Sequence, residues 1–103
     1  MVEWCAIVFD KKGSDRSACR PQHLEGVSSS FGKGLLKCAG AIYHEVGADG
    51  KPTNFAGSNL HIEADTKEEA LQVIYNDVFA KEGIWDLDNI IIYPFGCAVR
   101  APK

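Results

Sequence analysis

The sequence predicts one small α+β domain in which two helices alternate with four strands. The chain has 103 residues, the length of a single domain, and we expect one domain over residues 1–103. Apolar runs of strand length lie near both ends of the chain, and a helix-capping motif lies between a strand pattern and a helical pattern. Almost half of the residues are apolar, which is typical of a chain that folds around a core.

The first predicted strand is Trp4 to Phe9, which is apolar throughout. A strand of this kind is expected to be buried on both faces. After a polar loop, Arg20-Pro21 begins a helix, because proline suits the first helical position. Gly32 and Gly34 end the helix. One apolar helical face is predicted from Leu24, Val27 and Phe31.

The second and third predicted strands form a hairpin. Leu35 to Val46 and Phe55 to Ala64 have strand patterns, and the turn formers of Gly47 to Pro52 connect them. In the third strand the apolar positions alternate with polar ones, so the two sets face opposite sides of the sheet. The apolar set is Leu60, Ile62 and Ala64, and the polar set is Asn59, His61 and Glu63.

The second helix begins at a capping box, in which Thr66 and Glu69 satisfy free backbone amides. The helix is expected to bury Ala70, Leu71, Ile74 and Val73. Asp77 interrupts it and can cap a short helical turn, Val78 to Glu82, which Gly83 closes.

The last predicted strand, Ile90 to Phe95, is again almost wholly apolar. The resulting order, β-α-β-β-α-β, is the ferredoxin-like arrangement. Two helices can cover only one face of a four-stranded sheet, yet the first and last strands are apolar on both faces. We therefore predict a homodimer in which two sheets pack face to face.

Composition excludes several classes of partner. The net charge is −3, and no segment concentrates Lys and Arg with aromatic residues, which argues against binding to nucleic acid or an anionic membrane surface. No apolar run is long enough to cross a bilayer, and the first residues do not resemble a signal peptide. The four cysteines are widely spaced without a C-x-x-C pair, so we expect reduced and mostly buried thiols in a cytoplasmic protein.

Four segments occur in the order typical of one family. Arg20 to Leu24 reads R-P-x-H-L, Phe55 to Ser58 ends in G-S, Asn76 to Gly83 is similar to D-P-[YF]-x-x-x-G, and Ile92 to Phe95 fits a last strand. On these motifs the chain resembles the YciI-like (YCII-related) family over nearly its whole length.

The resemblance implies a dimeric α+β barrel with a pocket where His23 and Asp77 meet. The best-understood activity of the family is the elimination of chloride from a chlorinated hydroxyhydroquinone, with a His–Asp pair proposed as the acid–base unit. The chain departs from the family pattern at Val78, which replaces a proline, at His61, where relatives often carry an aliphatic residue, and over residues 37–55. These departures bear on the substrate more than on the fold.

His23 and Asp77 are the candidate catalytic residues. His23 falls near the first turn of the first helix, where the partial positive charge of the helix terminus favours the neutral imidazole that a general base needs. The alternative is a surface histidine with a local hydrogen bond. Asp77 could fix the tautomer of the imidazole and balance its charge, or it could simply cap a helix.

Four further residues are candidate substrate-binding groups: Arg20, Ser58, Asn59 and His61. Arg20 could anchor an anionic group or remain a solvated charge at the start of the helix. Ser58 and Asn59 could supply hydrogen bonds or end a strand, and His61 could be a buried, hydrogen-bonded histidine. The histidines show no i, i+4 pair and no cysteine pair has zinc spacing, so we expect no metal, and the absence of a glycine-rich phosphate loop predicts no nucleotide cofactor.

Two functions remain open at the level of the sequence. The first is a cofactor-free lyase or isomerase that acts on a small aromatic or quinol-like metabolite through His23 and Asp77. The second is a non-catalytic metabolite-binding or accessory protein that uses the same pocket.

Overall fold

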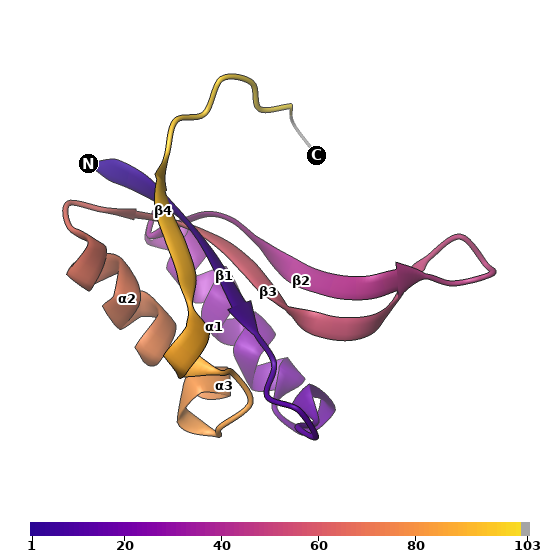
Figure 1. The fold of residues 1–103 in the computed structure, drawn as a ribbon. Coiled ribbons are helices and arrows are strands. Elements are labelled where there is room, and N and C mark those ends of the chain that lie inside the picture. The colour runs from indigo at the N-terminus through magenta and orange to yellow at the C-terminus, as the bar shows by residue number, and fades with distance from the viewer. Residues whose placement is uncertain (102–103) are drawn as a thin grey trace.

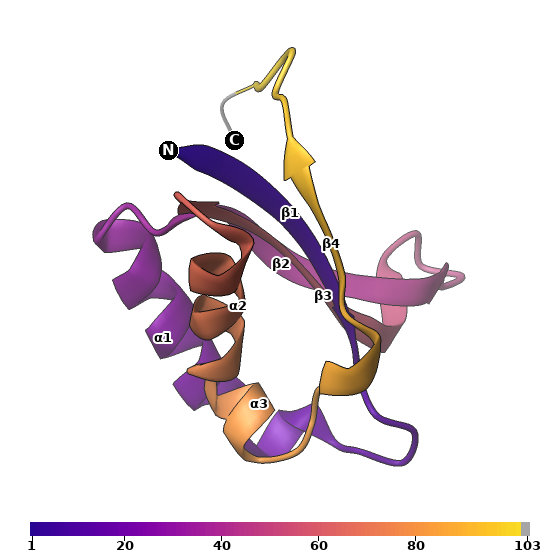
Figure 2. The ribbon, with the colours of Figure 1, turned by 60° about the vertical axis from the view of Figure 1, so that its left-hand side comes forward.

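The computed structural model describes residues 1–101 as a four-stranded antiparallel sheet with helices on one face (Figures 1 and 2). The strands are β1 (Val2–Phe9), β2 (Leu36–Val46), β3 (Pro52–Ala64) and β4 (Ile91–Phe95). The helices are α1 (Arg20–Gly32), α2 (Lys67–Tyr75) and α3 (Val78–Lys81), with single 3₁₀ turns η1 (Arg16–Ala18) and η2 (Leu87–Asn89).

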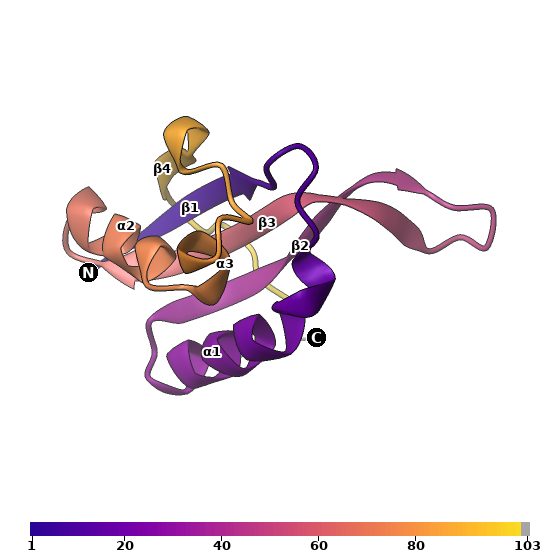
Figure 3. The same cartoon turned by 90° about the horizontal axis from the view of Figure 1, so that it is seen from below.

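The predicted order of elements is confirmed. The strands lie in the order β2-β3-β1-β4, so the first and third strands are central, as in the ferredoxin-like fold. Helix α1 packs along β2 and α2 packs along β3 on the same side of the sheet (Figure 3). The two 3₁₀ turns were not predicted, because each is only one turn long and lies in a polar segment.

The core lies between this sheet face and the helices. The predicted inward set of β3, Leu60, Ile62 and Ala64, is buried, and Ala70 and Ile74 of α2 pack against it. Leu71 and Val73 are only half-buried.

The predicted apolar face of α1 is wrong at two of its three positions. Leu24 is 45% exposed and Phe31 is 63% exposed, whereas His23 is only 7% exposed. Residues four apart share a helical face, so His23 and Val27 turn inward together while Leu24 lies farther around the helix. A polar side chain therefore occupies a core-facing position on α1.

Two caps place the segment that follows β3. The Thr66 hydroxyl accepts a hydrogen bond from the backbone N–H of Glu69 at 3.2 Å, as predicted. Asp77 then caps α3 by accepting from the N–H of Phe79 at 2.9 Å. Gly83, at φ +73°, ends α3 in a conformation that favours glycine.

Gly57 marks a close approach between β1 and β3. A Cβ at this position would lie 2.2 Å from the carbonyl oxygen of Val8, so only glycine fits without a backbone shift. Next to it the pairing of β2 with β3 shifts between Ile42 and Tyr43, which is a β-bulge. Beyond the bulge the hairpin extends away from the helices (Figure 1).

The opposite face of the sheet, termed the open face here, is not covered by helices (Figure 2). We predicted that β1 would be buried on both faces. Within the single chain it is buried on one, where Ala6 and Val8 are inaccessible, while Phe9 on the other is 39% exposed. Ile91, Tyr93 and Phe95 of β4 are also exposed. The homodimer that would cover this face stays a prediction.

The prediction that the cysteines are mostly buried is wrong. Cys5 and Cys19 are half-buried, and Cys38 and Cys97 are exposed; all four are free thiols. Cys38 pairs with His61 on the side of the sheet away from the helices, and Cys97 follows β4, so both lie outside the core. Within residues 1–101 no helix has both the length and the apolar character needed to cross a membrane.

Candidate functional site

His23 and Asp77 lie together although they are 54 residues apart in the chain. The Nδ1 atom of His23, in the first turn of α1, is 2.8 Å from Oδ1 and 2.9 Å from Oδ2 of Asp77. Asp77 comes from the junction of α2 and α3. Both side chains are largely buried.

The hydrogen-bond network assigns the ring nitrogens of His23. An ionised carboxylate can only accept, so Nδ1 carries the proton that it shares with Asp77. No hydrogen bond to Nε2 forms within residues 1–101. The other role considered for Asp77 is also present, since Oδ1 caps α3. One carboxylate therefore orients the imidazole and caps a helix.

Two buried aromatic rings hold the imidazole of His23. Phe79 stacks on it with centroids 3.9 Å apart and planes at 7°, and Trp85 meets its edge at 5.6 Å and 84°. Phe79 and Trp85 are fully buried. The Nε1 of Trp85 has no hydrogen-bond partner within the described chain, and its ring serves as core.

Sequence reasoning missed Arg16, which is only 4% exposed. Its guanidinium forms two hydrogen bonds to Asp10, at 2.8 and 2.5 Å, and one of 3.3 Å to the Ser58 hydroxyl. It also lies 4.8 Å from the ring centroids of Phe55 and Phe79. An arginine in a short polar loop gave no signal of burial, because its partners come from other segments.

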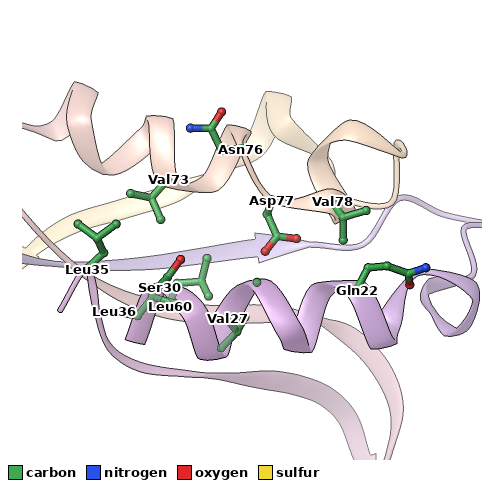
Figure 4. A pocket seen from close by; sticks show the side chains of 11 residues that line it. Gln22, Val27, Ser30, Leu35, Leu36, Leu60, Val73, Asn76, Asp77 and Val78 are labelled. Carbon is green, nitrogen blue, oxygen red and sulfur yellow. The ribbon is translucent and has the colours of Figure 1, made fainter. Parts of the chain in front are cut away.

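The pair borders cavities on two sides. Asp77 lines a cavity of about 340 Å³ between α1 and α2, with Val27, Leu60 and Val73 among its apolar walls (Figure 4). Figure 4 shows the Asp77 carboxylate reaching from the α2–α3 junction toward α1. His23 lines a smaller space of about 40 Å³ with Arg16 and Arg20, next to β2.

The other candidates divide between the two faces of the sheet. Arg20 shares the smaller space with His23, and its guanidinium lies 5.6 Å from the Phe55 ring. Ser58 faces the helices but is 1% exposed and bonded to Arg16, so it supports that arginine and is closed to a ligand here. Asn59 and His61 face the other side, away from His23.

His61 and Asn59 have partners of their own. His61 Nδ1 lies 2.7 Å from Glu3 Oε2, and the Cys5 thiol donates to Asn59 Oδ1 at 3.8 Å. Within residues 1–101 no three His, Cys, Asp or Glu side chains gather in a way that could hold a metal ion.

Comparison with known proteins gives relatives at the level of the whole chain. No protein-family model matches the sequence. It is 35% identical over 97 residues to fusaric acid biosynthesis protein 2 of Gibberella fujikuroi, covering 92% of this chain and 93% of that protein. It is 29% identical to aspercryptin biosynthesis cluster protein B of Emericella nidulans, covering 98% of this chain and 67% of that protein.

Among solved structures, the chain is similar to the 5-chloro-2-hydroxyhydroquinone dehydrochlorinase of Burkholderia phenoliruptrix, determined in complex with 2,5-dihydroxybenzoquinone. The TM-score is 0.71 at 24% sequence identity, over 91% of this chain and 93% of that one. This likeness establishes a shared fold.

Proposed function

Because the chain belongs to the family of fusaric acid biosynthesis protein 2, we propose that it acts on a small molecule, as a cofactor-free lyase or isomerase. The observation that carries the proposal is the hydrogen bond between His23 Nδ1 and the Asp77 carboxylate. We further assign the chain to the YciI-like group, on the motifs around these two residues.

In the proposed mechanism His23 is the base. With its proton on Nδ1, the neutral ring has its lone pair on Nε2, which can remove an acidic proton from a substrate. Asp77 balances the positive charge that the ring then gains, and the stacked Phe79 ring keeps the imidazole in one plane. In an elimination Nε2 takes the proton, the electron pair of the broken O–H or C–H bond forms the new double bond, and the leaving group departs with its own bonding pair.

The proposed substrate is a small aromatic or quinol-like metabolite. The two relatives are named for biosynthesis, and the solved neighbour is named for a chlorinated hydroquinone and holds a dihydroxybenzoquinone. Quinols carry acidic hydroxyl groups, so a single imidazole base is sufficient to start the reaction. Arg20, which borders the same space as His23, is the proposed partner of a substrate oxygen.

We also propose that the protein is a cytoplasmic homodimer in which open faces pack together. The exposed apolar side chains of β1 and β4 support this arrangement, since burial of such a surface favours association. Sedimentation velocity should give the mass of two chains, and a single-chain mass over the whole micromolar range would contradict the dimer.

The decisive experiment measures both turnover and binding with chlorinated hydroxyhydroquinones and 2,5-dihydroxybenzoquinone. The variants are His23→Gln and Asp77→Asn, and the control is His44→Gln, which changes an exposed histidine. Loss of turnover by about 100-fold or more in His23→Gln, with a loss in Asp77→Asn and none in His44→Gln, supports the base. If the wild type binds these compounds without turnover, and His23→Gln changes only the affinity of binding, the accessory-protein alternative is favoured instead.

A further inference from the structure

A small space beside the first turn of α1 carries positive charge without a matching carboxylate. It has a volume of about 40 Å³, and Arg16, Arg20 and His23 line it. Across from them lie Ala39 and Ala41 of β2, which pair with inward positions of β3, so the space is on the helix side of the sheet. The homodimer proposed above packs through the open faces and therefore leaves this space uncovered.

Arg20 is the unmatched charge. It is half-buried, and it forms no ion pair within residues 1–101. Burial of a cation costs free energy until an anion meets it. Two nearby carboxylates are already engaged, since Asp10 is bound to Arg16. Asp77 is bound to His23 in the same way. An anion from outside the described chain would therefore complete this space.

The N-terminal end of α1 adds to the positive potential. A helix N-terminus carries a partial positive charge, which favours acidic residues in the first turn. Helix α1 has no acidic residue there; it begins with Arg20-Pro21, and the side chain of its N-cap residue, Cys19, forms no capping hydrogen bond. An arginine at this position opposes the helix dipole, and an anion bound beside it would offset both charges.

Arg16 has donors left for such an anion. Three of its five N–H groups are engaged, two with Asp10 and one with Ser58, and the two on Nη1 form no hydrogen bond within residues 1–101. These contacts, together with the Phe55 ring 4.8 Å away, hold the guanidinium in place before any ligand binds. The Arg20 guanidinium lies over the same ring, at 5.6 Å. The two cations are therefore positioned by a shared aromatic surface.

We propose that Arg16 and Arg20 together bind a carboxylate of the substrate, so that the protein acts on a small aromatic carboxylic acid. Guanidinium groups match a planar carboxylate with parallel N–H···O hydrogen bonds. A space of about 40 Å³ suits a group of this size, and the aromatic ring extends out of it. The atoms next to the carboxylate then lie beside His23. The inference rests on the proposed function for the role of His23 alone, since carboxylate binding does not require turnover.

The test compares 2,5-dihydroxybenzoate with 2,5-dihydroxybenzamide, which has the same ring but no charge. Calorimetry gives the dissociation constant of each compound for the wild type, Arg20→Gln, His23→Gln and Lys33→Gln, where Lys33 is an exposed cation at the other end of α1. The wild type should bind the carboxylate about 10- to 100-fold more tightly than the amide, the range expected for charge-assisted hydrogen bonds. Arg20→Gln should lose most of this preference, whereas His23→Gln and Lys33→Gln should keep it.

Equal affinities of the wild type for the two compounds, or no binding of the carboxylate, would overturn the proposal. An equal loss of preference in Lys33→Gln would also overturn it, because the effect would then be one of net charge. The result is distinct from that of the proposed function. A preference that depends on Arg20 without turnover leaves a carboxylate-binding protein, whereas turnover that depends on His23 without the preference indicates an uncharged substrate.

The part of Arg16 is tested in the wild type, because substitution of this buried residue should destabilise the fold. In ¹⁵N spectra of the guanidinium groups, the signals of Arg16 and Arg20 should move when 2,5-dihydroxybenzoate is added and stay in place with the amide. The signals of Arg100, which pairs with Glu3, should not move with either compound. Movement of the Arg20 signals without those of Arg16 would reject Arg16 as a carboxylate ligand.

Discussion

Phe79 contacts both members of the His23–Asp77 pair. Its ring stacks on the imidazole at a centroid distance of 3.9 Å, and its backbone N–H donates to Asp77 Oδ1 at 2.9 Å. One buried residue therefore fixes the plane of the base and the position of the carboxylate that orients it.

Phe79→Leu should separate these two contacts, because leucine keeps the backbone N–H but removes the ring. We expect the cap of α3 to persist while the His23 imidazole signals shift and broaden in NMR spectra. The free energy of unfolding in urea should fall by less than the approximately 3 to 5 kcal/mol expected for Phe79→Ala. The control is Phe31→Leu on the exposed side of α1, which should cost no more than about 0.5 kcal/mol.

Substitutions at Asp77 should distinguish helix capping from charge. Asparagine caps helices about as well as aspartate, so Asp77→Asn should leave the cap of α3 largely intact. Asp77→Ala removes the cap and should lower the free energy of unfolding by about 0.5 to 2 kcal/mol more than Asp77→Asn. If Asp77→Ala and Asp77→Asn lower the free energy of unfolding in urea by the same amount, the cap contributes nothing to stability.

Gly57→Ala should destabilise the sheet, because the new methyl group would meet the backbone of Val8. Overpacking of this kind costs about 1 to 3 kcal/mol. Gly40→Ala on β2 is the matched control, since no atom lies within 4 Å of its Cβ position. We expect Gly40→Ala to be neutral or stabilising by up to about 1 kcal/mol, and thermal unfolding of both variants checks the difference.

The buried Arg16–Asp10 pair should show strong coupling. Arg16→Met leaves the Asp10 carboxylate without its partner. We expect the free energy of unfolding to fall by about 3 to 5 kcal/mol. Adding Asp10→Asn should restore part of this loss, because the unpaired charge is then gone. Lys37→Met breaks the exposed pair with Glu63 and should cost at most about 1 kcal/mol in the same denaturation assay.

The lowered pKa of Glu3 predicts that part of the free energy of unfolding is lost at acid pH. The hydrogen bond that Arg100 donates to the Glu3 carboxylate at 2.6 Å is the main cause of the lowered pKa in the folded state, so the unfolded chain binds the proton more readily. The stabilisation is therefore complete above the ordinary glutamate pKa of about 4.3 and is lost as pH falls through the lower folded-state pKa. Glu3→Gln should flatten the loss of stability below about pH 4. An unchanged pH profile would show that Arg100 does not hold this carboxylate in solution.

The fold was largely predictable because its signals are local. The alternation in β3, the capping box at Thr66 and the glycine at position 83 each constrain a few neighbouring residues, and the structure agrees with them. The inward face of α1 was not predictable by the same means. His23 is buried there because two residues from a distant segment accommodate it: the Asp77 carboxylate forms a hydrogen bond with its ring, and the Phe79 ring stacks on it.

The candidate site shows the same difference between residues marked by a local motif and residues whose partners are distant in the chain. The family motifs indicated His23 and Asp77, which lie together, but Arg16 and Asp10 carried no motif and were missed. Ser58, a candidate substrate-binding group, forms a hydrogen bond with Arg16. Alternation along β3 predicted that Asn59 and His61 face away from the helices, and the structure agrees; their role as substrate-binding groups stays a prediction.

The alternation along β3 also offers a practical division for protein engineering. Ser58, Leu60 and Ile62 are buried under the helices, whereas Asn59 and His61 lie on the open face. A combinatorial library limited to positions 59 and 61, together with their strand neighbours on the open face, would vary the chemistry there while leaving the hydrophobic interior untouched. The open face could then be evolved separately from the His23 site within one small scaffold.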